Sequence, residues 1–216
     1  GNSQSLAVWI VLFSLIIFAT FRYDGFASIY NVSSFLNYNS IFISISLGMC
    51  FVIMTGGIDL SVGSVAAFTS VVAAYLSPYG IQFALPIAIL AGAAFGAVNA
   101  FFIIMMRIPP FIATLATMLG AKGGALIISG AETIGVDWGS NFTKLGLEKA
   151  FGVLPWTILI VLLLALVLWV ILEKTSIGRT ILAIGGGEEA SILMGLRVTR
   201  AKAFAYILSG ACAGLA

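Results

Sequence analysis

Residues 161–170 have the sequence VLLLALVLWV, and they lie inside an interval, 150–172, that carries no charged residue. Two further uncharged intervals span 25–58 and 60–106. A membrane crossing needs roughly 20 apolar residues, because the hydrocarbon core is about 30 Å thick and a helix rises about 1.5 Å per residue. Each interval can therefore hold at least one transmembrane helix, and the chain is predicted to be a polytopic membrane protein.

The composition supports this class and argues against others. Of the 216 residues, 8% are charged and 61% are hydrophobic, which is more apolar surface than a water-soluble fold can bury. Barrel strands alternate apolar and polar side chains, and residues 161–170 do not, so an all-α helix bundle is favoured. The net charge of +2 gives no indication of nucleic-acid binding.

Metal, disulfide and cofactor sites are not expected. The chain contains no histidine, the commonest metal ligand and general base. Cys50 and Cys212 lie far apart in apolar runs, where each is interpreted as a small core residue. The phosphate-loop pattern GxxxxGK[ST] is also absent, so the chain is predicted to bind no nucleotide or other cofactor.

The predicted topology has about six complete crossings. Turns are expected at residues 77–80 and 107–110, where Pro and Gly favour chain reversal or begin a helix. A seventh helix is expected to start near residue 203 and to be truncated. The predicted crossings lie at 6–21, 35–55, 60–76, 81–106, 111–129 and 151–172.

Basic residues predict the orientation, because cytoplasmic loops carry an excess of Lys and Arg. Under strict alternation, residue 107 and the segment 173–202 fall on one side, where basic residues outnumber acidic ones. The segments 22–24 and 130–150 fall on the other side, where acidic residues are in excess. We therefore expect 173–202 and the N-terminus to be cytoplasmic and 130–150 to form an external loop, either an interfacial belt or a docking surface for an external partner.

Gly56–Gly63, with the sequence GGIDLSVG, interrupts an otherwise apolar region. Asp59 followed by Ser61 is typical of a helix N-terminus, since a side-chain oxygen can accept from first-turn amides. One interpretation is a turn at the cytoplasmic surface with an Asp cap. The other is a broken helix at membrane depth that lines a polar path. A proton relay is a third, although no second acidic residue lies in a predicted crossing.

Lys122 lies inside the predicted crossing 111–129. Such a cation should face the bundle interior or a wet cavity, or extend to the interface, and Asp59 is one conceivable partner. Thr114 and Thr117 share the segment, and their hydroxyls can bond to their own helix or contact a solute.

A small-xxx-small pattern runs from Gly92 through Gly96 to Ala100, and it predicts close approach of two helices. The neighbouring Asn99 is interpreted as an interhelical hydrogen-bonding group, with solute binding as the alternative.

The segment 173–202 contains a predicted short helix, Glu188–Leu196, that follows three glycines and is terminated by Gly195. Its acids, Glu188 and Glu189, lie at the N-terminal end, which the helix dipole favours. Its apolar residues would be exposed unless something covers them. The helix either lies on the bilayer or its own bundle, or inserts, with the small Ala190 and Ser191, into a groove on another protein.

These motifs resemble the membrane-spanning permease subunits of ribose-type ABC sugar importers. GGIDLSVG at Gly56–Gly63 is similar to the most recognisable string of that family, and PFIATL at Pro110–Leu115 to its next motif. The stretches Gly178–Gly186, Glu188–Gly195 and Tyr206–Gly210 resemble its cytoplasmic loop and the helix after it. The resemblance spans essentially the whole chain, in order.

Four positions depart from the family pattern. Lys122 stands where Arg is usual, and Lys cannot make the bidentate contacts of Arg. Gly187 replaces an often polar residue, Ser191 replaces an alanine, and Ala100 follows Asn99 where glycine is common.

The resemblance implies a single permease domain over 1–216, a fragment lacking its C-terminal helices, in the bacterial cytoplasmic (inner) membrane. It implies import of a monosaccharide, a pentose or hexose, by a non-enzymatic subunit. Its expected partners are cytoplasmic ATPases, a second permease subunit, an external sugar-binding protein and membrane lipid. Glu188, Glu189, Ala190, Ser191 and Gly195 would form the ATPase-coupling loop.

For the translocation path or broken helix, the candidate residues are Gly56, Gly57, Asp59, Ser61, Asn99, Thr114, Thr117 and Lys122. The alternative function is a secondary transporter with a broken helix at Gly56–Ser61. An intramembrane enzyme is disfavoured, because the chain has no histidine and no evident nucleophile–base pair.

Overall fold

The computed structural model describes residues 2–150, 152 and 154–216, and it is an all-α bundle with one very short hairpin. Five of the described helices are long and apolar enough to cross a membrane, and a shorter apolar helix covers Leu6–Arg22. The helices are α1 (Asn2–Arg22), α2 (Ile29–Met54), α3 (Val62–Leu76), α4 (Ile81–Ala100), α5 (Pro110–Ser129), α6 (Lys144–Leu147), α7 (Trp156–Lys174), α8 (Ser176–Gly186), α9 (Glu188–Leu193) and α10 (Val198–Leu215).

The predicted all-α membrane bundle is thus confirmed, with shifted boundaries. α2 begins at Ile29 instead of residue 35, because the Ser28 hydroxyl caps it by accepting from the Asn31 amide at 3.2 Å. α7 begins at Trp156, after Pro155. The predicted crossing started at residue 151, which lies outside the described residues.

α10 begins at Val198, five residues before the predicted start near residue 203. The prediction placed Arg200 and Lys202 outside the helix because they are charged. Instead they occupy its first two turns, where Lys202 forms an ion pair with Glu188 of α9.

The reversal predicted at residues 107–110 is present. α4 continues into a π-helical turn at Phe101–Met105, and Arg107 then takes a left-handed conformation with φ of 56°. α5 starts at Pro110, where the missing amide would be unpaired anyway. At the other end, α5 stops at Gly130 with φ of 63°, a conformation that glycine adopts without steric cost.

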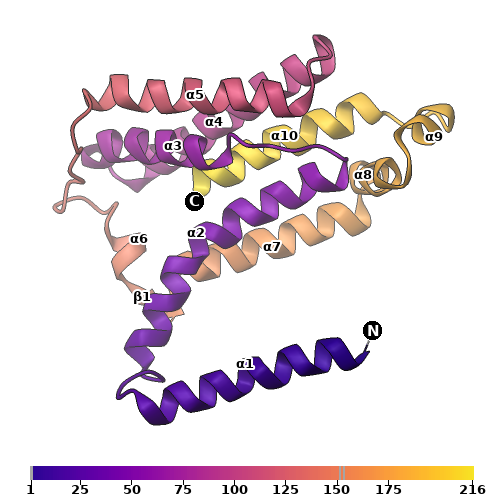
Figure 1. Cartoon of the computed structure of the whole chain (residues 1–216). Coiled ribbons are helices and arrows are strands. Elements are labelled where there is room, and N and C mark those ends of the chain that lie inside the picture. The colour runs from indigo at the N-terminus through magenta and orange to yellow at the C-terminus, as the bar shows by residue number, and fades with distance from the viewer. Residues whose placement is uncertain (1, 151, 153) are drawn as a thin grey trace.

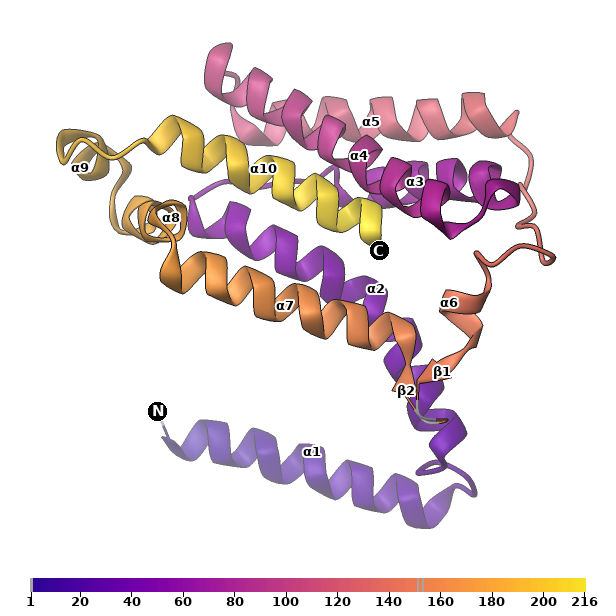
Figure 2. The same cartoon turned by 180° about the vertical axis from the view of Figure 1, so that it is seen from behind.

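The connecting segments gather at two opposite ends of the bundle (Figures 1 and 2). α8 and α9 lie at the end where α2 and α7 finish, whereas α6 and the hairpin of β1 (Lys149–Ala150) and β2 (Leu154–Pro155) lie at the other. The segments 173–202 and 130–150 therefore lie at opposite ends, which fits strict alternation. α1 lies apart from the other helices in both views.

α4 and α10 form the closest helix pair of the core, and glycines make this possible. A Cβ added to Gly96 would lie 2.2 Å from the Tyr206 carbonyl oxygen, and one added to Gly92 would lie 2.2 Å from the Gly210 carbonyl oxygen. No side chain fits in so little space. The close approach that the small-xxx-small pattern predicts is confirmed, with α10 as the partner helix.

Candidate functional site

A buried polar cluster lies where the chain passes from α2 to α3. This connection runs back alongside α10 before α3 begins (Figure 1). Asp59 is 2% exposed and Ser61 is 1% exposed. One carboxylate oxygen of Asp59, Oδ1, accepts from the Ser61 amide at 3.0 Å and from the Ser61 hydroxyl at 2.6 Å.

Three other helices contribute to the cluster. From α4, the Asn99 side-chain amide donates to the Ser61 hydroxyl at 2.9 Å and approaches Asp59 Oδ1 at 3.5 Å. From α5, the Thr117 hydroxyl donates to Asn99 Oδ1. From α10, the Ser209 hydroxyl donates to Asp59 Oδ2 at 3.1 Å. The carboxylate thus accepts hydrogen bonds on both oxygens, which a buried charge requires.

This geometry bears on the interpretations of the Gly56–Gly63 segment. A turn on the bundle surface does not fit, because Asp59 and Ser61 are buried. Nor does Asp59 cap α3 through several first-turn amides, since among the described residues its backbone donor is Ser61, the N-cap residue itself. α2 and α3 run in opposite directions (Figure 1), so the segment is a non-helical connection that re-enters the bundle, where side chains satisfy its polar groups, and not a break in one continuous helix.

Gly57 lets the connection pass directly over α10. A Cβ at this position would lie 2.5 Å from the Tyr206 hydroxyl, so any larger residue would displace the chain. Gly56 has φ of 73°, which favours glycine for conformational reasons instead. The two adjacent glycines are therefore required for different physical reasons.

Two predicted candidates lie outside the cluster. Thr114 is fully buried, and its hydroxyl donates to the Pro110 carbonyl of its own helix at 2.8 Å, as helix threonines commonly do. Lys122 is exposed and forms no salt bridge among the described residues, so the conceivable pairing with Asp59 is absent from this structure.

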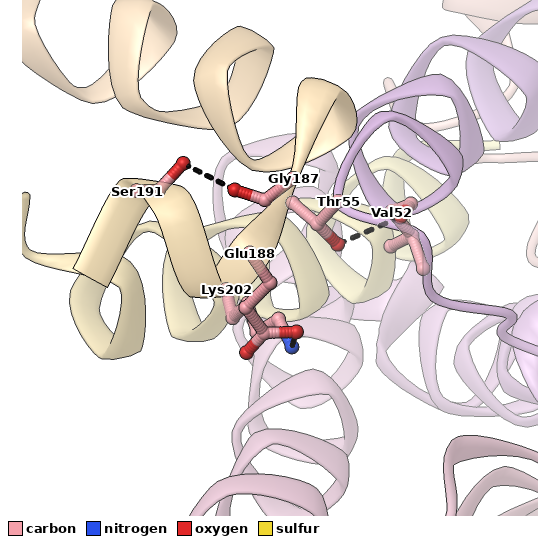
Figure 3. Close-up of polar contacts among 6 residues, drawn as sticks. All are labelled: Val52, Thr55, Gly187, Glu188, Ser191 and Lys202. Carbon is pink, nitrogen blue, oxygen red and sulfur yellow. Dashed lines mark hydrogen bonds and ion pairs between the residues drawn. The ribbon is translucent and has the colours of Figure 1, made fainter. Parts of the chain in front are cut away.

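The predicted short helix is present as α9, beside the end of α2 (Figure 3). Ser191 is buried, and its hydroxyl donates to the Gly187 carbonyl at 2.8 Å. Glu188 pairs with Lys202 of α10, with 2.6 Å between the carboxylate oxygen and Nζ. α9 ends two residues before Gly195, which has φ of 76°, so the predicted stop by Gly195 holds to within a turn.

The apolar side of α9 is uncovered. Ile192 is 56% exposed, Leu193 is 88% exposed and Met194 is 67% exposed. Adjacent apolar side chains at the end of a bundle, away from its membrane-length helices, indicate a contact surface. The small Ala190 is exposed beside them.

Sequence reasoning missed two residues of these clusters. Ser209 is a lone serine in an apolar helix and carries no local signal of its partner. Lys202 was assigned to a loop, although its position opposite the acidic start of α9 could have suggested an ion pair.

An all-α bundle of membrane-length apolar helices is the architecture of a polytopic membrane protein. A family model described as branched-chain amino acid transport system / permease component matches residues 31–216, and the chain belongs to this family. It is a multi-pass protein of the bacterial cytoplasmic membrane.

Curated relatives are similar over nearly the whole chain. The ribose import permease protein RbsC of Bacillus subtilis (strain 168) is 36% identical over 100% of this chain and 68% of the relative. RbsC of Escherichia coli (strain K12) is 36% identical over 96% of this chain and 66% of its own length. The D-allose transport system permease protein AlsC of the same strain is 31% identical, over 93% and 62%. The chain spans about two thirds of the length of these relatives. No solved structure matches it.

Proposed function

We propose that this chain is the membrane-spanning permease subunit of an ABC importer for a monosaccharide. Relatives that carry the names ribose, D-allose, fructose and L-arabinose transport proteins support this assignment of substrate class. ATP is hydrolysed by separate cytoplasmic subunits, a second permease subunit completes the membrane unit, and an external binding protein delivers the sugar.

The observation that carries this proposal is the exposed apolar side of α9 at the end of the bundle opposite the external segment. Leu193, at 88% exposure, would be unfavourable in water unless another protein covers it. A short helix with an apolar side fits a groove on a partner subunit. The ATPase is the partner that this function requires on that side.

Within the permease, α9 is attached to the core through α10. The pair between Glu188 and Lys202 holds the start of α9 against the second turn of α10. Two turns further along α10, Ser209 bonds to Asp59 in the connection between α2 and α3. Movement of α9 by the ATPases would therefore reach the polar cluster through one rigid element.

The test is ATP-driven uptake in proteoliposomes that contain the permease, its ATPase and its binding protein. Uptake of a radiolabelled sugar, screened among D-ribose, D-allose, D-fructose and L-arabinose, should require internal ATP and the binding protein. Uptake should be insensitive to a protonophore. If no ATP-dependent uptake is found for any of the four sugars, the proposed function is wrong.

The buried Asp59 favours one alternative. A carboxylate on non-helical backbone inside a membrane bundle is also the kind of group that binds a coupling ion in a secondary transporter. That mechanism predicts uptake that a protonophore or sodium removal abolishes and that continues without the ATPase. The same proteoliposomes separate the two functions.

A further inference from the structure

The outer faces of α3 and α7 differ in a way that lipid contact does not explain. α7 presents large apolar side chains to the outside, such as Leu162 at 58% and Leu166 at 55% exposure. α3 instead exposes the small residues Gly63, Ala67 and Ser70 along most of its length, and a large side chain, Tyr75, is exposed only near its last residue. Lipid-facing helices are covered by long apolar side chains, whereas small residues are typical of protein-facing or solute-facing surfaces.

Beside this small-residue face lies a groove whose lining is more apolar than polar but includes charged side chains. It is a cavity of about 740 Å³ between α3, α5 and the start of the external segment. Its polar lining comes from all three elements and includes Ser64, Ser70, Lys122, Ser129, Glu132 and Thr133. The cluster around Asp59 contributes no residue to it.

Lys122 makes this groove unsuited to acyl chains. It lies seven residues before the end of α5, so its Cα is about 10 Å inside the helix end at 1.5 Å per residue. A lysine near the middle of a membrane-spanning helix costs about 2.5–3.5 kcal/mol when it faces lipid. Charged side chains at such depth normally face a wet cavity or another polypeptide.

We propose that the groove between α3 and α5 is a solute-binding wall of the translocation passage and that Lys122 is its principal hydrogen-bond donor. This inference rests on the proposed function and adds a site to it. A monosaccharide is neutral and presents donors and acceptors on every side. The lysine ammonium supplies donors only and the Glu132 carboxylate supplies acceptors only. The hydroxyls of Ser70 and Ser129 donate to carbonyls of their own helices and so offer acceptor lone pairs to a solute.

The groove opens on the outside of the described helices, and we place the second permease subunit of the proposed function opposite it. The small residues of α3 allow that subunit to approach closely on one side of the groove. The volume exceeds that of one sugar ring and leaves room for water, which suits passage better than tight binding, because a solute must also leave the site.

Thiol labelling of the assembled transporter tests the location. In a background where the exposed Cys50 is replaced by serine, Ser70→Cys would be compared with Leu162→Cys. The two positions are matched in depth, since each lies six residues from the predicted external end of its helix. A charged, membrane-impermeant methanethiosulfonate reagent would be added outside during ATP turnover.

Ser70→Cys should react at least tenfold faster than Leu162→Cys, and its modification should block uptake. Saturating imported sugar, delivered by the binding protein, should slow the labelling. Equal rates at the two positions would show that the groove faces lipid, and rapid labelling that leaves uptake unchanged would show that it is wet but not on the passage. Either result overturns the proposal.

Lys122 is tested by Lys122→Met and Lys122→Arg in the same vesicles. Loss of a charge-assisted hydrogen bond should lower the uptake rate of Lys122→Met about tenfold or more, and Lys122→Arg should retain most of it. Equal uptake by wild type and Lys122→Met refutes the donor role, as does a loss that arginine fails to restore. These results leave the proposed function intact, since that stands on ATP-dependent uptake by the wild type.

Discussion

Replacement of Gly96 by alanine tests the α4–α10 contact. The new methyl carbon would lie 2.2 Å from the Tyr206 carbonyl oxygen and 2.8 Å from the Ile207 Cα. Both neighbours are backbone atoms, so no side chain can rotate away and the two helices must separate. Overpacking of this kind costs about 1–3 kcal/mol, while removing a glycine from a helix interior returns about 0.5–1 kcal/mol. A 2.2 Å contact with a backbone atom is severe, so the upper half of the overpacking range applies and the expected net loss is roughly 1–2 kcal/mol.

The assay is the thermal unfolding midpoint of the purified permease in detergent. For a chain of this length each kcal/mol corresponds to about 2–4 °C, so Gly96→Ala should lower the midpoint by about 2–8 °C. Gly120→Ala on α5 is the matched control, because a Cβ there meets nothing within 4 Å, and its midpoint should stay level or rise. If the unfolding midpoint of Gly96→Ala equals or exceeds that of Gly120→Ala, the two helices tolerate the extra methyl group and the reasoning about this contact is refuted.

Three other changes have defined outcomes. Asp59→Asn should lower the free energy of unfolding by about 1–3 kcal/mol, because an amide cannot accept from every donor around the carboxylate. Loss of uptake at unaltered thermal stability would instead indicate a path-lining role. Gly195→Val should abolish uptake without lowering the amount of permease in the membrane. The left-handed conformation of Gly195 costs a branched residue about 1–2 kcal/mol and would distort the end of α9. Surviving ATP-driven uptake would contradict the coupling role. Lys202→Met should change the free energy of unfolding by less than about 1 kcal/mol, because the ion pair with Glu188 is partly exposed. It should nevertheless reduce the amount of sugar taken up per ATP hydrolysed. An unchanged ratio would show that the pair does not attach α9 to α10.

The membrane-length helices could be predicted because each is an uninterrupted apolar run, and this signal survives without tertiary information. α8 was missed as a separate helix. Its buried residues, Ile181 and Ile184, repeat at helical spacing, but the run is short and carries Arg179, so it was assigned to a loop. Helix ends were displaced wherever a cap or an ion pair extended the helix beyond its apolar core, as at Ser28 and Lys202.

The candidate site could be predicted in part. Asp59 and Ser61 are two residues apart, so their interaction is local and visible in the sequence. Asn99 and Thr117 were recognised as polar groups in apolar segments, but which groups they meet depends on how α3, α4 and α5 pack. Ser209 lies 150 positions from Asp59, and no sequence pattern in a single chain connects them.

The proximity of Lys202 and Ser209 on α10 limits how this permease can change shape. Seven residues separate them, so they lie on one side of the rod, about 10 Å apart along its axis. A rotation of α10 about its own axis that moves Lys202 would also move the Ser209 hydroxyl away from the Asp59 carboxylate. Rotation and sliding of α10 would each break the bond between Ser209 and Asp59, whereas a rocking motion that pivots on Asp59 would keep it.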